Sequence, residues 1–463
     1  MNFVTLQYAV FLTCVVTLYW QLNRLQQNRM LLAVSWFFYA CWDWRFLGLI
    51  ILICSVDFIC GAKIAAADNK SQKRKWLISA IIIDLGILAY FKYMNFFIDS
   101  FVDIMAVIGV ETSLPMLSII LPAGISFFTF QSLSYSIDIY RGELKPEKSL
   151  LDFYAFVAFF PQLVAGPIVR AQEFLFQLSE KRTFNSAVFE RGIERILIGL
   201  VQKAVVADTL AIQWVEPVFS NPSEFGSASL WLASVAYAVQ IYCDFAGYTN
   251  IAIGSSLLMG FSLPENFHYP YLAKNFSDFW RRWHMTMSRF FRDYVYIPLG
   301  GNRAGPTRSQ FNLAATTLVS GLWHGASWNF VGWGAAHGAF LWIQRILPTL
   351  PSHLLIRCIK QIIFWILILL TWIIFRSQDW DTTQAYYYGL LFSEGVKQLE
   401  FSWFASIALF LGCADHIWVW WKGESYLSRK SLLWQRALFW FGLIMIVLYM
   451  KPIEPNAFIY FQF

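Results

Sequence analysis

The chain has 463 residues, of which 58% are hydrophobic, 19% aromatic and only 14% charged. Soluble domains carry about a quarter charged residues, so this composition excludes an ordinary soluble protein and indicates transmembrane helices. The formal net charge of +6 belongs to the loops, where it sets membrane orientation; we expect no nucleic-acid binding. The seven cysteines include no C-x-x-C pair, which disfavours a disulfide framework or a zinc site. We predict one all-α polytopic membrane domain over residues 1–463.

The N-terminal part predicts membrane spans separated by basic loops. The span at 3–22 has neither a basic leader nor a small-residue cleavage site, so we expect it to be retained. Residues 30–41 and 46–67 predict a hairpin. The loop N-K-S-Q-K-R-K (69–75) is the clearest cytoplasmic loop under the positive-inside rule, which puts the N-terminus outside and lets 76–97 cross outward.

The next segments contain helix-breaking residues. Residues 114–137 are expected to form a returning span with a kink at Pro122 and Gly124. The run F-P-Q-L-V-A-G-P-I-V-R (160–170) holds two prolines and a glycine, which predicts a broken or re-entrant helix. Residues 174–195 are amphipathic and are expected to lie along the inner surface.

Ionisable residues occur inside the following spans. Lys203 and Asp208 are five residues apart, a spacing imperfect for an α-helical pair, so we expect each to find another partner. Gln240 and Asp244 have helical i, i+4 spacing within the span at 229–261.

The C-terminal half begins with the largest basic excess in the chain. Residues 264–308 hold seven basic and three acidic side chains, which places them at the cytoplasmic face. Because Arg345, Arg357 and Lys360 also favour the inner side, we expect 312–343 to be a re-entrant or tightly bent pair of helices. Three further spans complete the bundle, at 361–375, 403–421 and 433–450.

Two histidines are the main candidates for chemistry. A histidine inside an apolar segment is costly unless it faces a cavity or a partner. His324, between Trp323 and Gly325, is either a general base or a buried histidine hydrogen-bonded between helices; the missing side chain of Gly325 is expected to let a substrate approach. His284 lies among arginines, either as a site residue or in a phospholipid-binding patch. His337 is expected to be a packing or helix-end residue.

The arginines near His284 recur at spacings that allow three of them to share one helical face. They are Arg281, Arg282, Arg289 and Arg292. They form either a positive-inside anchor or a binding surface for an anionic donor such as a phosphorylated cofactor. The run G-G-N-R-A-G (300–305) lacks the ending of a Walker loop, and neither a G-x-S-x-G elbow nor an HExxH motif occurs, so we predict no metal site.

The aromatic end of the chain has two interpretations. Residues 452–463 contain Pro452 and Pro455 and end in F-I-Y-F-Q-F. They form either an interfacial anchor or a tail that folds into a cavity and presents Tyr460 as a nucleophile, which a base would have to activate.

Five motifs between about residues 120 and 340 resemble the membrane-bound O-acyltransferase family, in particular the bacterial branch that modifies alginate and teichoic acid. They are P-A-G-I-S-F-F-T-F-Q (122–131), F-F-P-Q-L-V-A-G-P-I (159–168), Q-I-Y-C-D-F-A-G-Y (240–248), N-F-S-D-F-W-R-R-W-H (275–284) and L-W-H-G-A-S-W-N-F (322–330). The resemblance implies that His324 is the family's histidine and that His284 is its second polar position. It also implies a ring or bowl of about ten or more transmembrane and re-entrant helices around a central tunnel, and a tail whose Tyr460 relays the acyl group.

We therefore predict a multi-pass inner-membrane O-acyltransferase that moves acetyl groups from a cytoplasmic thioester, with acetyl-CoA as donor substrate and no tightly bound cofactor. The acceptor is an exopolysaccharide, with alginate as the first choice. An extracytoplasmic SGNH-type acetyltransferase is the expected partner, and membrane lipid surrounds the chain. Substrate-binding residues are Arg281, Arg282, Arg289, Trp323 and Asn329, and His284 or Asn329 steadies the oxyanion. Alternatives are acetylation of cellulose or peptidoglycan by the same mechanism, or a non-catalytic transporter or scaffold.

Overall fold

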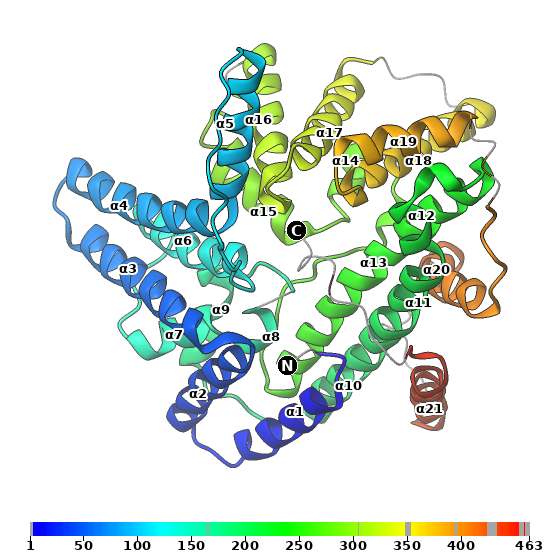
Figure 1. The fold of residues 1–463 in the computed structure, drawn as a ribbon. Coiled ribbons are helices and arrows are strands. Elements are labelled where there is room, and N and C mark those ends of the chain that lie inside the picture. Colours follow the sequence, from blue (N-terminus) through cyan, green and yellow to red (C-terminus); the bar gives the residue numbers. More distant parts are fainter. Residues whose placement is uncertain are drawn as a thin grey trace. The chain divides into compact units, whose positions relative to one another are not determined.

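The computed structural model describes residues 3–163, 166–303, 305–347, 353–392, 395, 397–423, 433–452 and 458. Throughout these residues the regular structure is helical, apart from one isolated bridge between Phe225 and Lys397, so the predicted all-α class is confirmed (Figure 1). The chain divides into two compact units. One comprises Met1–Ile193 with Ala252–Pro264, and the other comprises Glu194–Ile251 with Glu265–Phe463.

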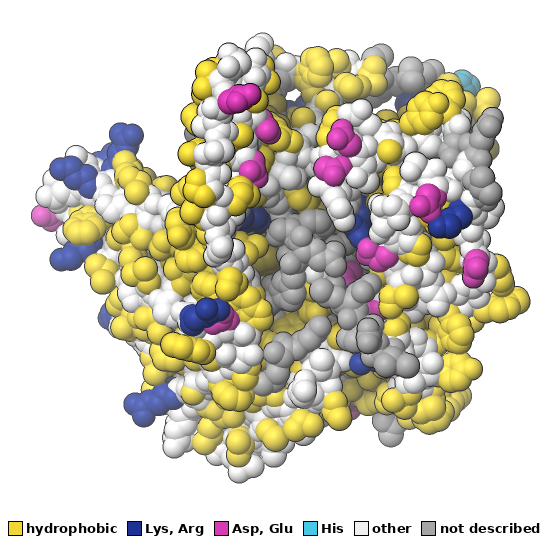
Figure 2. All heavy atoms as spheres, in the orientation of Figure 1, with side chains coloured by type: hydrophobic (Ala, Val, Ile, Leu, Met, Phe, Trp, Pro, Cys, Tyr) yellow, Lys and Arg dark blue, Asp and Glu magenta, His cyan; other side chains and the backbone are white. Residues whose placement is uncertain are grey.

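Five helical runs are long and apolar enough to cross a membrane. They are Arg24–Ala66, Lys70–Val107, Ser186–Ser220, Leu354–Arg376 and Trp403–Lys422. Many large apolar side chains on these runs are exposed, among them Ile82, Ile362 and Trp420, as expected for contact with lipid (Figure 2). These runs indicate a multi-pass membrane protein.

The first unit is built from short and long helices in chain order. They are α1 (Leu6–Tyr19), α2 (Arg24–Asp43), α3 (Leu47–Ala66), α4 (Lys70–Leu88), α5 (Met94–Val107), α6 (Ile125–Arg141), α7 (Leu150–Val157), α8 (Phe160–Leu163) and α9 (Ala171–Ser179). Helices α3, α4 and α6 pack against one another. Exposed basic side chains gather at the free end of the α3–α4 hairpin (Figure 2), where Lys70, Arg74 and Lys75 lie in the first turns of α4. The basic cluster is therefore where it was predicted, but residues 70–75 are helical and do not form a loop.

Three predictions in this unit can be compared with the structure. The span predicted at 114–137 is wrong in its first half, because α6 begins only at Ile125, after Gly124 adopts a left-handed φ of 74°. The broken helix around residue 160 is confirmed, since α7 ends at Val157 and α8 is a single turn. The amphipathic segment 174–195 is interrupted between Ser179 and Ser186.

The second unit contains the remaining α-helices and three π-helical segments. They are α10 (Ser186–Leu200, which begins in the first unit), the π-helical η3 (Val201–Ala207), α11 (Asp208–Leu210), η4 (Ala211–Val215), α12 (Glu216–Ser220), α13 (Ser227–Leu258, which ends in the first unit), α14 (Phe276–Trp280), α15 (Met285–Phe291), the π-helical η7 (Arg292–Tyr296), α16 (Pro306–His324), α17 (Trp328–Ile346), α18 (Leu354–Arg376), α19 (Trp380–Phe392), α20 (Trp403–Lys422) and α21 (Leu433–Met450). Helix α20 packs against η3 and α11, and α18 packs against α17.

Helices α16 and α17 form the tightly bent pair predicted for residues 312–343 (Figure 1). Their axes approach closely because glycines line the seam between them. A Cβ on Gly321 would lie 2.2 Å from the carbonyl oxygen of Phe330, and a Cβ on Gly334 would lie 2.4 Å from that of Thr317. The close packing sets the position of the turn that follows His324.

Lys203 and Asp208 do pair, contrary to the prediction from their spacing. Lys203 Nζ lies 2.7 Å from Asp208 Oδ1. The reason is the π-helical winding of η3, in which residues i and i+5 come to the same face. Lys203 also has the further partner that was expected, since its Nζ lies 2.5 Å from Asp244 Oδ1.

Candidate functional site

His324 is the last residue of α16 and lies in an aromatic enclosure. Its side chain is 3% exposed. Its ring centroid lies 5.0 Å from that of Trp323, 5.1 Å from that of Trp333 on α17 and 5.3 Å from that of Phe375 on α18. Helices α16, α17 and α18 thus hold one imidazole among rings that exclude water.

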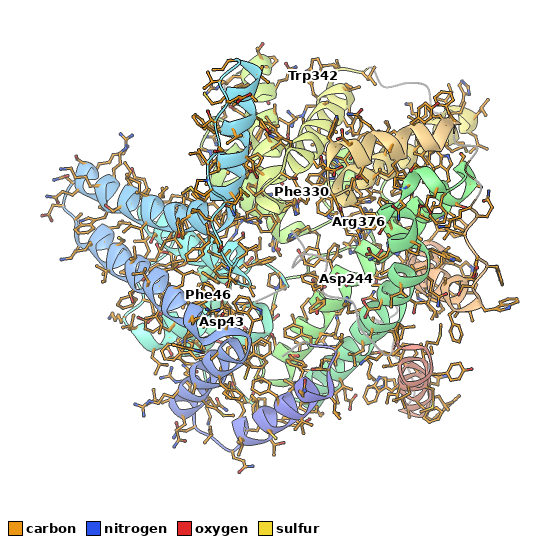
Figure 3. All side chains as sticks on the ribbon, viewed as in Figure 1. Asp43, Phe46, Asp244, Phe330, Trp342 and Arg376 are labelled. Atoms are coloured by element: carbon orange, nitrogen blue, oxygen red, sulfur yellow. The ribbon has the colours of Figure 1, made fainter. Side chains whose placement is uncertain are left out.

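Gly325 is required for a reason other than the one predicted. The space next to its Cα is filled by the ring of Phe330, on α17 (Figure 3), and a Cβ would lie 2.0 Å from the Cε2 atom of that ring. Gly325 therefore lets the α16–α17 turn close over Phe330, and the approach of a substrate through its missing side chain is not supported.

His284 lies between α14 and α15 with a backbone φ of 43°, a value that non-glycine residues rarely adopt. Its fully buried ring places Nδ1 3.0 Å from Asn266 Oδ1. The backbone N–H of Thr286 donates to the same Oδ1, which fixes that atom as the amide oxygen. Nδ1 of neutral His284 must therefore carry the proton, and Nε2 is a buried acceptor without a hydrogen-bond partner among the described residues.

The two histidines lie side by side. Their ring centroids are 6.3 Å apart, and the ring of Trp323 contacts both, at 5.9 Å from His284 and 5.0 Å from His324. Phe245 of α13 closes the other side of His284 at 4.7 Å. The structure thus brings together three of the predicted site residues, His284, His324 and Trp323, in a buried aromatic centre.

A further polar group lies in this centre. Trp333 is 1% exposed, and its indole N–H has no hydrogen-bond acceptor in the part of the chain that the structure describes. Buried indole N–H groups usually find a partner, because leaving one unpaired costs about 1–3 kcal/mol. The sequence drew attention to Trp323 and not to this residue, nine positions after His324.

The arginines do not share one helical face, so that prediction is wrong. The chain bends between α14 and α15, which separates Arg281 and Arg282 from Arg289. Arg282 pairs with Asp278 at 3.0 Å, while the side chain of Arg281 is exposed. Partial burial raises the pKa of Asp278, but the Lys274 backbone N–H and the Arg282 guanidinium outweigh this and hold the pKa below its ordinary value.

The remaining predicted residues have different surroundings. The amide nitrogen of Asn329 donates to the carbonyl of Ser377 at 3.1 Å and to Thr383 Oγ1 at 3.3 Å, so both of its N–H groups have acceptors. His337 packs between rings, at 4.6 Å from Trp333, as predicted for a packing residue. Tyr460 lies outside the described residues. No group of three or more His, Cys, Asp or Glu in the described part of the chain is arranged to hold a metal ion.

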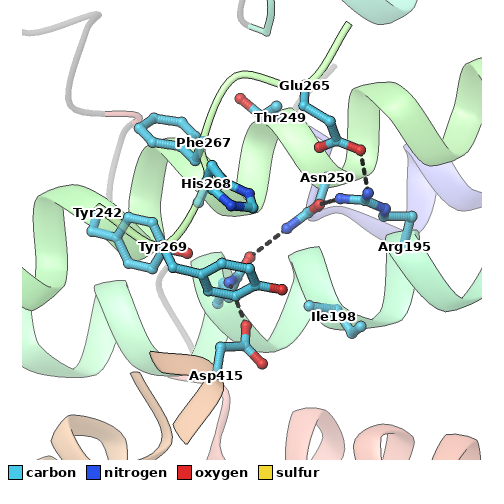
Figure 4. Close-up of a pocket in the computed structure, with 12 residues that line it drawn as sticks. Arg195, Ile198, Tyr242, Thr249, Asn250, Glu265, Phe267, His268, Tyr269 and Asp415 are labelled. Carbon is cyan, nitrogen blue, oxygen red and sulfur yellow. Dashed lines mark hydrogen bonds and ion pairs between the residues drawn. The ribbon is translucent and has the colours of Figure 1, made fainter. Parts of the chain in front are cut away.

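The second unit also contains a pocket of about 230 Å³ with charged, polar and aromatic side chains in its lining (Figure 4). A chain of hydrogen bonds crosses it: Glu265 pairs with Arg195, Arg195 donates to Asn250 at 2.6 Å, Asn250 donates to Gln202 at 2.7 Å, and Gln202 makes a long contact of 3.5 Å to Asp415. The lining also includes Tyr242, Phe267, His268 and Tyr269.

An aromatic ring in the lining of this pocket packs against a ring that contacts His284. The ring of Phe267 lies 5.1 Å from that of Phe245, which contacts His284. Sequence reasoning missed the pocket, although Asp415 is a carboxylate within an apolar helix and such residues mark functional sites.

The sequence is similar to those of known membrane acyltransferases. The model of the membrane-bound O-acyltransferase family (MBOAT) matches residues 141–378. The chain is 39% identical over 393 residues to the probable alginate O-acetylase AlgI of Azotobacter vinelandii, covering 83% of this chain and 77% of that protein. The corresponding values for the AlgI protein of Pseudomonas aeruginosa are 39% identity over 394 residues, with coverage of 84% and 74%.

A relative whose name gives another substrate is similar over a comparable length. The chain is 34% identical over 412 residues to the peptidoglycan O-acetyltransferase of Helicobacter pylori, covering 82% of this chain and 76% of that protein. The region matched by the family model contains His284, His324 and the rings that enclose them. The chain belongs to the membrane-bound O-acyltransferase family and is a multi-pass membrane O-acyltransferase.

Proposed function

We propose that the protein acetylates an exopolysaccharide, with alginate as the first choice of acceptor. The adjacent His284 and His324, within the region that matches the family, are the observation that carries the proposal. The similarity to two AlgI proteins supports alginate, and the similarity to a peptidoglycan O-acetyltransferase makes peptidoglycan the second candidate. The location is the inner membrane of a bacterial cell.

His324 acts as the general base in this proposal. It takes the proton of the acceptor hydroxyl while the hydroxyl oxygen forms the new C–O bond to the thioester carbonyl. The C–S bond then breaks, and the leaving thiolate takes the proton back from His324. Nε2 of neutral His284 is an acceptor, so His284 does not donate to the oxyanion.

Trp333 supplies the oxyanion donor. Neutral His284 offers no N–H on its unpaired nitrogen, and the N–H groups of Asn329 already have acceptors. The indole N–H of Trp333 lacks one and belongs to a ring 5.1 Å from that of His324. A donor of this kind contributes about 10²–10³ in kcat. Trp333→Phe keeps an aromatic ring at this position and removes the donor, so a kcat loss of that size with unchanged KM is expected.

The donor is a cytoplasmic acyl thioester, with acetyl-CoA as the first choice. The pocket of Figure 4 supports a path for the uncharged arm of the donor that carries the thioester. The positive charge of Arg195 is matched by Glu265, and Asp415 adds a second carboxylate. Phosphates are disfavoured there, and the exposed Arg281 suits them better. In the full proposal the helices form a ring around a central tunnel, which an experimental structure in lipid would test.

The acceptor side involves the chain's own tail and a partner. Tyr460 receives the acetyl group, and an extracytoplasmic SGNH-type acetyltransferase passes it to the polymer. Tyr460→Phe is expected to stop polymer acetylation while donor binding is retained. Normal acetylation by this variant would rule out Tyr460 as the acyl relay, and direct transfer to the acceptor would remain.

The central experiment is His324→Ala, compared with His353→Ala on an exposed position. We expect polymer O-acetyl content, measured by NMR of the purified polysaccharide, to be lost only in the first variant, with equal protein in the membrane. Retained acetylation would overturn the role of His324. If the protein were a transporter or a scaffold, the purified protein would transfer no label from acetyl-CoA to itself or to the polymer.

A further inference from the structure

A groove of about 450 Å³ lies between α16 and α17 in the second unit. Its lining residues recur three and four positions apart, so each helix contributes one face. Helix α16 contributes Phe311, Ala314 and Leu318, and helix α17 contributes Ala335, Ala339 and Trp342. All six side chains are exposed. The groove therefore opens on the surface of the hairpin, whereas His324 is buried inside it.

Small side chains form the floor of the groove, and large ones form its walls. The helices touch at Gly338, where a Cβ would lie 2.5 Å from Thr317 Oγ1. The hydroxyl of Thr317 donates to the carbonyl of Ala314 at 3.0 Å, so this hydroxyl needs no partner from a ligand. The larger side chains of Phe311 and Trp342 flank the floor. A slot of this shape suits one unbranched hydrocarbon chain, which gains dispersion contacts with both walls along its length.

The end of the groove at the start of α16 and the end of α17 is basic. The guanidinium carbon of Arg308 lies 5.1 Å from the ring centroid of Phe311. Arg345 follows Trp342 by three residues, and its Nη1 lies 3.3 Å from the hydroxyl oxygen of Ser309, the neighbour of Arg308. Both arginine side chains are exposed. Two guanidinium groups therefore lie together where the apolar slot ends.

No acidic side chain of these helices balances the two charges. The sequence contains no Asp or Glu between Asp293 and Asp379. Within the described part of the chain, neither Arg308 nor Arg345 forms an ion pair. The N-terminus of α16, which follows Gly305 and has no side-chain cap, adds partial positive charge at the same end. This charge favours an anionic ligand, and guanidinium groups suit phosphate because they donate paired hydrogen bonds.

We propose that the groove binds an anionic phospholipid, with one acyl chain between Phe311 and Trp342 and the phosphate at Arg308 and Arg345. A phospholipid joins a long hydrocarbon chain to a phosphate, so it matches both the slot and the charge at its end. This end of the hairpin is the one predicted to face the cytoplasm, and the cytoplasmic leaflet carries anionic lipids.

The lipid site and the histidine site lie at different ends of the hairpin. Trp342 is near the end of α17 opposite to Phe330, which packs at the turn after His324 (Figure 3). A chain that contacts both α16 and α17 stabilises their packing without entering the buried centre. The lipid therefore braces the hairpin from outside and takes no part in the acyl transfer.

The charges also distinguish this occupant from a second copy of the protein. Two copies in one membrane have the same orientation, so a two-fold contact through the groove would bring their basic ends to the same level. Arg308 and Arg345 of each copy would then face those of the other. A neutral phospholipid could fill the slot, but its headgroup would leave the two guanidinium charges unbalanced.

Native mass spectrometry of the full-length protein, purified in mild detergent, tests the headgroup site. The probes are phosphatidylglycerol and phosphatidylcholine with identical acyl chains, and we expect tighter binding of phosphatidylglycerol. Arg308→Gln/Arg345→Gln should weaken that binding about 30-fold, because each basic residue beside an anionic lipid surface contributes about fivefold. The matched control is Arg74→Gln/Lys75→Gln, which removes two exposed basic side chains from α4 and should leave the binding unchanged.

A second variant tests the slot. Ala339→Leu places a branched side chain between the walls and should weaken phosphatidylglycerol binding about tenfold, because the acyl chain loses its contacts there. Ala62→Leu adds the same side chain to an exposed position of α3 and should have no effect. Because a ligand of the folded state raises its stability, phosphatidylglycerol should raise the melting temperature of the wild type more than that of Ala339→Leu.

Three results would overturn the proposal. They are equal binding of the two lipids by the wild type, unchanged phosphatidylglycerol binding in Arg308→Gln/Arg345→Gln, and unchanged binding in Ala339→Leu. A lipid-free mass of two chains that falls to one chain in Ala339→Leu would assign the groove to a second copy instead. Lipid binding is measured without acetyl transfer, so its failure and the failure of the proposed function are distinguishable.

Discussion

At the scale of single residues, the chemistry of the site depends on hydrogen bonds that position imidazole rings. Asn266 Oδ1 accepts from both the backbone N–H and the hydroxyl of Thr286, at 3.3 and 2.9 Å, and this fixes the donor role of His284 Nδ1. The proton on Nδ1 leaves the lone pair on Nε2. A single amide thus decides which nitrogen of His284 carries the proton and which carries the lone pair.

Asn266→Ala should therefore release the tautomer of His284 and leave Nδ1 without its acceptor, at a cost of about 1–3 kcal/mol in stability. We expect ¹⁵N NMR of the labelled histidines to show His284 as a single Nδ1–H tautomer in the wild type and as a mixture of tautomers in the variant. Asn302→Ala, which alters an exposed amide, should not change the spectrum. An unchanged tautomer in Asn266→Ala would contradict the assignment.

Gly325→Ala should damage the site although it adds only a methyl group. The new Cβ would overlap the ring of Phe330 and displace the turn that follows His324. Overpacking of this kind costs about 1–3 kcal/mol. We expect a lower melting temperature and strongly reduced polymer acetylation, with partial recovery in Gly325→Ala/Phe330→Ala. If the single variant matches the wild type, the packing argument is wrong.

At the scale of helices, the α16–α17 hairpin presents His324, and its glycine seam determines how closely the two helices pack. Gly321 and Gly334 face each other's backbones, so the hairpin depends on the absence of side chains there. Between α14 and α15, by contrast, the helix is interrupted. Their break at His284 separates arginines that a continuous helix would have aligned.

Gly321→Ala should open this hairpin and lower the free energy of unfolding by about 1–3 kcal/mol. Gly48→Ala is the matched control, because a Cβ on Gly48 in α3 meets nothing within 4 Å. Alanine favours a helix interior over glycine, so the control should be neutral or slightly stabilising. Thermal unfolding in detergent distinguishes the two; equal melting temperatures would rule out the glycine seam as the cause of close packing.

At the scale of the whole molecule, the basic loops should determine orientation in the membrane. The exposed Lys70, Arg74 and Lys75 at the α3–α4 turn favour the cytoplasm, and the segment after α5 carries Glu111 and no basic residue before residue 141. The long helical run Lys70–Val107 separates these two sites and is apolar enough to cross the bilayer.

Reporter fusions test this orientation. A fusion after Gln72 should be active only with a cytoplasmic reporter, and a fusion after Glu111 only with an extracytoplasmic one. Replacing Lys70, Lys73, Arg74 and Lys75 by glutamine should weaken the bias at both positions, because the positive-inside rule depends on these charges. The reverse pattern in the unaltered protein would place the N-terminus inside.

The sequence by itself determined the all-α membrane class, the broken helix near residue 160, the bent pair around His324 and the family. These depend on local signals: apolar runs, prolines and glycines, and contiguous motifs. Only the tertiary structure decided that Lys203 pairs with both Asp208 and Asp244, that Phe330 occupies the space at Gly325, and that Asp415 lines a pocket. The contact of Lys203 with Asp244 and the pocket at Asp415 join residues far apart in the chain, whereas the contacts of Lys203 with Asp208 and of Gly325 with Phe330 depend on a π-helical turn and on a close helix-to-helix approach. Neither hydropathy nor spacing records these features.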